Sequence, residues 1–103
     1  MARPVESEPM IVSNGLRFPD DPAIMTGRLR TLLARGNYEA SEARALKAFV
    51  GAGSSVVELG AGIGYISTAA VCHHGADHVT CIEANPRLCD YIRRVHATNG
   101  VTG

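Results

Sequence analysis

The sequence has little that marks an exported, membrane or nucleic-acid-binding protein. Its 103 residues include three cysteines, an odd number without Cys-x-x-Cys spacing, which argues against a disulfide scaffold or a zinc site and favours a reducing cytoplasm. No apolar run approaches the roughly 18 residues that a membrane span needs, and the first residues lack the apolar core of a signal peptide. Ten Lys and Arg balance ten Asp and Glu, whereas a nucleic-acid module usually has a basic excess.

The first half of the chain predicts a hairpin followed by two helices. Asn14-Gly15 between short apolar runs is typical of a type I′ hairpin turn. Asp21-Pro22 predicts the start of a helix that Gly36 ends. A second helix is expected from residue 38 or 41 to residue 50. Its expected buried face consists of Ala45, Leu46, Phe49 and Val50.

The second half alternates strand and helix patterns. Residues 54–59 predict a strand, the glycine-rich stretch Gly60–Gly64 follows at once, and residues 65–74 return to a helical pattern. Residues 78–82 predict a second strand. A last helix is expected to open at Asn85-Pro86, where asparagine can cap the free N–H groups. This order predicts an α/β fold with a parallel βαβ unit.

The glycine-rich stretch has the context of a nucleotide-binding loop. Gly60, Gly62 and Gly64 stand at alternate positions between a strand and a helix, where a tight turn must leave the backbone open to a ligand. The helix that follows points its free N–H groups at the same place. Glu83 ends the second strand, and an acid at this place can accept both hydroxyls of a ribose.

The same residues bear on other interpretations of this stretch. One is a glycine-rich turn in a domain without a ligand. A dinucleotide fingerprint needs its third glycine at position 65, where this chain has Tyr65, so an NAD-binding domain is disfavoured. A P-loop is excluded because no Gly-Lys-Ser/Thr follows. The adjacent His73 and His74 point to different helix faces and so do not predict a metal site.

Two segments resemble a known enzyme family. Val56–Gly64 resembles motif I, (D/E)xGxGxG, of the class I S-adenosylmethionine-dependent methyltransferases, and Cys81–Pro86 resembles their acidic motif after the second strand. Within that superfamily the chain is most similar to the FkbM-like methyltransferases, on Glu83–Pro86, Asn99-Gly100 and Gly36–Glu39. Ala84 stands where proline is common in that family. The resemblance covers about residues 36–100.

The resemblance implies S-adenosylmethionine as the cofactor. It places Glu58 beneath the methionine part, the glycine loop along the methionine and ribose, and Glu83 at the ribose hydroxyls. Ala84 and Asn85 would flank the adenine, and Tyr38-Glu39 would close over the cofactor. The implied cofactor-binding residues are Tyr38, Glu39, Glu58, Gly60, Ala61, Gly62, Ile63, Gly64, Glu83, Ala84 and Asn85. Alternatives stay open: Glu58 could cap the loop through backbone N–H groups, and Tyr38 could pack on the core.

The implied fold is the N-terminal part of a doubly wound, Rossmann-like class I methyltransferase sheet, preceded by a β-hairpin and helices and incomplete. We expect residues 1–10 to form a loose tail, residues 11–50 the hairpin and helices, and residues 51–103 the first βαβα part of the cofactor-binding domain. The implied activity is O-methyl transfer to a small-molecule or sugar-like acceptor, although no residue can be assigned as the catalytic base. The alternative is a non-catalytic module that binds a cofactor or partner. With two parallel strands, self-association through the open sheet edge is expected.

Overall fold

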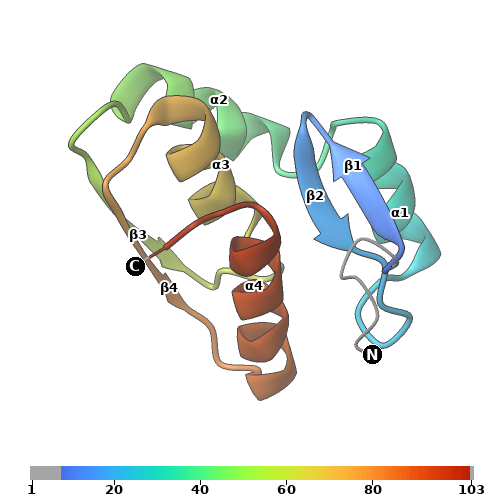
Figure 1. The fold of residues 1–103 in the computed structure, drawn as a ribbon. Coiled ribbons are helices and arrows are strands. Elements are labelled where there is room, and N and C mark those ends of the chain that lie inside the picture. The colour runs from blue at the N-terminus through green and yellow to red at the C-terminus, as the bar shows by residue number, and fades with distance from the viewer. Residues whose placement is uncertain (1–7, 103) are drawn as a thin grey trace.

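The computed structural model describes residues 8–102 and has the predicted α/β order of elements (Figure 1). Residues 1–7, most of the expected loose tail, lie outside the described residues. Two two-stranded sheets are formed, one antiparallel and one parallel. The elements are β1 (Met10–Ser13), β2 (Leu16–Pro19), α1 (Gly27–Ala34), α2 (Ala40–Phe49), β3 (Ser55–Leu59), α3 (Tyr65–His74), β4 (His78–Ile82) and α4 (Pro86–Thr98).

The hairpin forms at the turn that the sequence predicts. Asn14 and Gly15 have φ angles of 50° and 81°, which are the two left-handed residues that a type I′ turn needs. β1 and β2 pair antiparallel, with Ser13 opposite Leu16. Leu16 and Phe18 are buried, so β2 supplies the apolar face of the hairpin.

The first helix begins later than predicted. Asp21 does open a helical turn, because its backbone oxygen accepts from the N–H groups of Ile24 and Met25 at 2.9 and 2.8 Å. That turn stops there, and α1 begins at Gly27 with Thr26 as its cap, the Thr26 hydroxyl accepting from Leu29 at 3.1 Å. Thr26 therefore caps the helix in place of Asp21, because a threonine hydroxyl can also accept from the free N–H groups of a first helical turn.

The predicted buried face of α2 is wrong in part. Leu46 is buried as expected, but Phe49 is 86% exposed and Ala45 is exposed. Ala43 packs against the core instead. The helix is rotated relative to the prediction because it packs on α3, a contact that its own periodicity could not reveal.

The second half folds as the predicted βαβα unit. β3 and β4 pair in parallel, with Glu58 opposite Cys81, and α3 connects them. Asn85 caps α4 by accepting from the N–H of Arg87 at 3.0 Å.

Residues of both halves share one hydrophobic core. α4 lies between the parallel sheet and the hairpin (Figure 1). Tyr91 on α4 donates its hydroxyl to the backbone oxygen of Pro19 at 2.7 Å.

The parallel sheet has one covered face and one bare face. Val79 on the covered face is buried, and Val56 packs against the core. The opposite face carries Val57, Leu59 and Ile82, which are 63%, 75% and 54% exposed. None of the helices in the described part of the chain has the length and apolarity that a membrane crossing requires.

Candidate functional site

The glycine loop turns sharply from β3 into α3. Gly60, Gly62 and Gly64 have φ angles of 65°, 58° and 78°, a left-handed conformation that strongly favours glycine. The N–H groups of Gly60 and Ala61 donate to the backbone oxygen of Ile82, at 2.8 and 3.2 Å. The loop is therefore held against the carboxyl end of β4, so that the ends of both parallel strands meet at one place.

The three glycines meet different surroundings. A Cβ on Gly60 would lie in open space, and one on Gly62 would lie 3.4 Å from the Tyr38 hydroxyl. A Cβ on Gly64 would lie only 3.1 Å from a methyl group of Ile92. Gly64 thus allows α4 to pack closely, whereas Gly60 and Gly62 keep the outer side of the loop free for a ligand backbone or ring.

The side chains between the glycines point inward. Ala61 and Ile63 are 1% and 3% exposed, and Ile63 belongs to the hydrophobic core. Both were expected to line a cofactor. In this structure their side chains are buried, so any contact with a ligand would be through their backbone atoms.

Glu83 holds the glycine loop. One carboxylate oxygen accepts from the N–H of Gly62 at 2.9 Å, and the other accepts from the N–H of Asn85 at 3.0 Å. These backbone donors, Asn85 first and then Gly62, lower the pKa of Glu83, so the side chain is ionised at neutral pH. Ala84 and Asn85, the other residues of this segment, are exposed at the same strand end.

Glu58 lies on β3 directly beneath the start of α3. Its carboxylate accepts from the N–H of Ser67 in the first turn of α3, at 3.2 Å, and the Cys81 thiol lies 3.9 Å away. The capping contact that was one alternative for Glu58 is therefore present. Burial raises the pKa of Glu58 to about 7, so this carboxyl group titrates much closer to neutral pH than an exposed glutamate does.

Tyr38 and Glu39 approach the loop from the start of α2. Glu39 has a φ of 46°, which turns the chain sharply into the helix. Tyr38 is half-buried and packs on Tyr65, with ring centroids 5.6 Å apart. Burial raises the pKa of Tyr38, and the carboxylates of Glu39 and Glu58 raise it further, which places these three groups together. Tyr38 therefore contacts the core and also faces the loop.

A cavity of about 310 Å³ lies beside Gly60, and its charged lining is acidic. Glu39, Glu42 and Glu58 all line it. Burial raises the pKa of Glu39, and the nearby Glu42 raises it further. Within residues 8–102 none of these three carboxylates forms a salt bridge, so together they favour a ligand that brings positive charge. Glu42, in the first turn of α2, was missed from the sequence; it lies close to Glu39, the residue that precedes this helix.

A polar contact behind the loop was also missed. The Ser67 hydroxyl donates to the backbone oxygen of Gly64 at 3.1 Å, and the His96 ring lies 2.8 Å from the same hydroxyl. Burial lowers the pKa of His96. The two side chains are 29 positions apart, so only the packing of α4 on α3 brings them together. No group of three or more His, Cys, Asp or Glu within residues 8–102 is arranged to hold a metal ion.

Comparison with known proteins places the fold. No protein-family model and no curated protein matches the chain. Among solved structures, it is similar to the crystal structure of a protein from Pyrococcus horikoshii described as a "putative transferase", with a TM-score of 0.65 and 24% sequence identity. The match covers 89% of this chain and 32% of that one. At this identity the likeness shows the fold alone, and it confirms the predicted α/β class. The chain spans about a third of the length of this neighbour.

Proposed function

We propose that the chain is the cofactor-binding part of an S-adenosylmethionine-dependent methyltransferase. The observation that carries the proposal is the acidic cavity formed by Glu39, Glu42 and Glu58 beside the glycine loop. The methionine part of this cofactor carries an ammonium and a sulfonium group, and both gain from nearby carboxylates. The sequence resemblance and the likeness to a protein described as a transferase support the same class.

The charge of the cavity argues against a dinucleotide. The pyrophosphate of NAD carries two negative charges, and three carboxylates near the loop would repel it. The buried Tyr65 at the position of a third fingerprint glycine argues in the same direction.

The geometry of Glu83 fits a ribose. Each carboxylate oxygen already accepts one backbone N–H, and each has a second lone pair for a hydroxyl group. The loop fits a ligand as well, because the space that a Cβ on Gly62 would fill lies between the loop and Tyr38. We place the ribose at Glu83, the adenine beside Ala84 and Asn85, and the methionine part near Glu58.

When bound, the cofactor supplies an electrophilic methyl group. The residues of this chain would bind and orient it, and this positioning is the main protein contribution to such a transfer. Glu58 and Glu39 would offset its positive charge, and Tyr38 would cover the loop. The acceptor, a small-molecule or sugar-like hydroxyl, is an expectation from the family resemblance, and we assign no catalytic base.

Isothermal titration calorimetry tests the proposal on the whole chain. S-Adenosylmethionine and S-adenosylhomocysteine should both release heat on binding, and NAD should release none. Glu83→Gln should weaken both ligands, because an amide cannot accept at both of its heavy atoms. Binding of NAD without binding of S-adenosylmethionine would overturn the proposal.

A second candidate is a module that binds a partner without catalysis. The bare sheet face at Val57, Leu59 and Ile82 favours it, since parallel strands are normally covered on both sides. A methyl-transfer assay on a longer protein that contains this chain distinguishes the two. Transfer to an acceptor supports the enzyme, and cofactor binding without transfer to any acceptor supports the module.

A further inference from the structure

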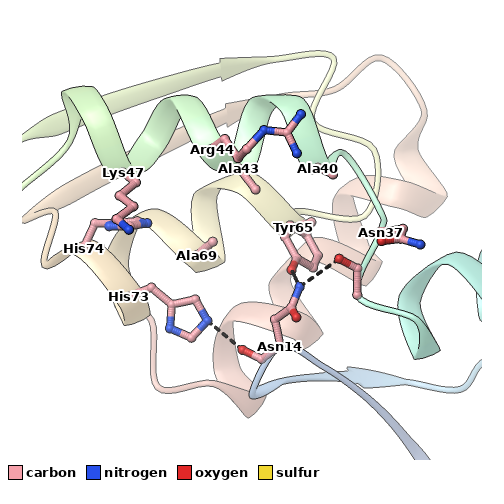
Figure 2. Close-up of a pocket in the computed structure, with 11 residues that line it drawn as sticks. Asn14, Asn37, Ala40, Ala43, Arg44, Lys47, Tyr65, Ala69, His73 and His74 are labelled. Atoms are coloured by element: carbon pink, nitrogen blue, oxygen red, sulfur yellow. Dashed lines mark hydrogen bonds between the residues drawn. The ribbon is translucent and has the colours of Figure 1, made fainter.

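A second cavity, of about 360 Å³, lies on another side of α2 (Figure 2). It is bounded by the hairpin turn at Asn14, by α2 and by α3. Ala40, Ala43, Arg44 and Lys47 line it from α2, at the three- and four-residue spacing of one helix face. Glu39 and Glu42 line the acidic cavity described above, so α2 separates two cavities of opposite charge.

Among the described residues, two cations and two histidines line this second cavity, and no Asp or Glu does. Arg44 and Lys47 come from α2, and His73 and His74 come from the last turn of α3 (Figure 2). Lys47 is the one lysine of a chain whose net charge is zero. Within residues 8–102, no carboxylate lies within 4.0 Å of Arg44 or Lys47, whereas Arg30, Arg93 and Arg94 are each paired.

Hydrogen bonds hold the side chains of His73 and Asn14 in place beside the cavity. The His73 ring donates through Nε2 to the backbone oxygen of Asn14 at 2.8 Å, so its orientation is fixed. The Asn14 side-chain amide donates to the Tyr65 hydroxyl at 2.8 Å and to the backbone oxygen of Gly36 at 3.2 Å (Figure 2). Tyr65 is 2% exposed and stacks on Phe18, with ring centroids 5.5 Å apart.

The Tyr65 hydroxyl is thereby left as a donor. Its oxygen accepts from Asn14, and its own proton has no acceptor within the part of the chain that the structure describes. A buried phenol whose proton is free at the floor of a basic cavity is suited to donate to an anionic oxygen. The amide of Asn14 fixes the direction of that donor, so little ordering is needed when a ligand binds.

We propose that this cavity binds the phosphate group of a small phosphorylated molecule. Arg44 presents the forked donors that suit phosphate oxygens, and Lys47 adds a second full positive charge. Two exposed cations beside two histidines match a doubly charged phosphomonoester better than a single carboxylate. The volume is that of a small-molecule pocket, with room beyond the phosphate for the rest of the ligand. The proposal is independent of the cofactor site.

The test is a nuclear magnetic resonance titration of the whole chain with methyl phosphate, at constant ionic strength. We expect saturable shifts for amides of α2 around Arg44 and Lys47 and of the last turn of α3. Arg44→Gln and Lys47→Gln should each raise the dissociation constant about tenfold, which corresponds to the loss of one charged contact. Lys47→Arg should retain binding.

Arg28→Gln is the matched control, because it removes the same charge from an exposed position on α1 that does not line the cavity. It should leave the dissociation constant within twofold. Equal weakening by Arg28→Gln would show a general charge effect and overturn the proposal. Saturation by acetate at the same concentrations would overturn the assignment to phosphate. Absence of saturable shifts with methyl phosphate would overturn the site itself. Circular dichroism of each variant confirms that these exposed substitutions leave the fold intact.

Discussion

Replacing Gly62 by valine perturbs the loop at the point where the ligand is expected. Gly62 has a φ of 58°, and a side chain in this left-handed conformation costs about 1–2 kcal/mol, more for a β-branched residue. Its Cβ would lie 3.4 Å from the Tyr38 hydroxyl, so the valine methyl groups would fill the space between the loop and Tyr38. We expect a loss of about 2–3 kcal/mol in the free energy of unfolding and loss of S-adenosylmethionine binding.

Gly53→Val separates the two effects. Gly53 also has a positive φ, 84°, but nothing lies within 4 Å of the position its Cβ would take. It should therefore show a similar loss of stability by urea denaturation, with calorimetric cofactor affinity retained for the folded fraction. Gly62→Ala is the milder variant if the valine unfolds the chain. Wild-type affinity in the Gly62 variants would refute the assignment of the loop to the ligand.

The buried carboxyl group of Glu58, the hydroxyl of Tyr91 and the bare sheet face give four further predictions. Because burial holds the pKa of Glu58 at about 7, S-adenosylmethionine affinity should rise from about pH 6 to about pH 8, and Glu58→Gln should flatten that profile. In the ligand-free chain, the stability contributed by Glu58 is fully present below pH 4.5 and is lost as pH rises through about 7. The free energy of unfolding of Glu58→Gln, measured by urea denaturation, should not show this decline. Tyr91→Phe removes a buried hydrogen bond to Pro19 and should cost about 1–2 kcal/mol in urea denaturation; no change would contradict that contact. Leu59→Lys on the bare sheet face should reduce self-association in sedimentation velocity, while Val12→Lys on the hairpin, also exposed, should not; equal effects would argue against the sheet.

The elements with strong local signals could be predicted from the sequence. Asn14-Gly15 dictates its turn because few residue pairs accept two positive φ angles. The βαβα unit follows from β-branched strands separated by glycines, and from Asn85-Pro86 as a cap. In these segments interactions between neighbouring residues determine the structure, so a short stretch of sequence is enough to predict it.

Features that depend on tertiary packing could not be predicted. The predicted start of α1 at Asp21-Pro22 was wrong, because Thr26 can also cap a helix and local sequence does not determine which turn continues. Phe49 was expected in the core, yet it is exposed, because the packing of α2 on α3 selects a different face. Apolar residues near a helix end fit more than one face, and only the partner decides.

The candidate site was predictable in its outline. The alternate glycines and Glu83 are close in the fold, as expected because the ends of parallel strands meet. The hydrogen bond from the Gly62 N–H to the Glu83 carboxylate was not predicted. The contact of Ser67 with His96 and the basic cavity depend on distant segments, and neither has a motif in the sequence. Gly64 shows a further limit, because the same residue type serves packing against Ile92 and not only ligand access.

The central claim is that S-adenosylmethionine binds at the glycine loop beside the acidic cavity. The most direct measurement is a heteronuclear correlation spectrum of the isotopically labelled chain, recorded during titration with S-adenosylmethionine. We predict that the backbone amides of Gly60, Gly62 and Asn85 shift together and saturate, while those of Gly15 in the hairpin turn and Gly100 after α4 stay unchanged. Loop amides that do not move with S-adenosylmethionine, or that move with NAD instead, would contradict the account.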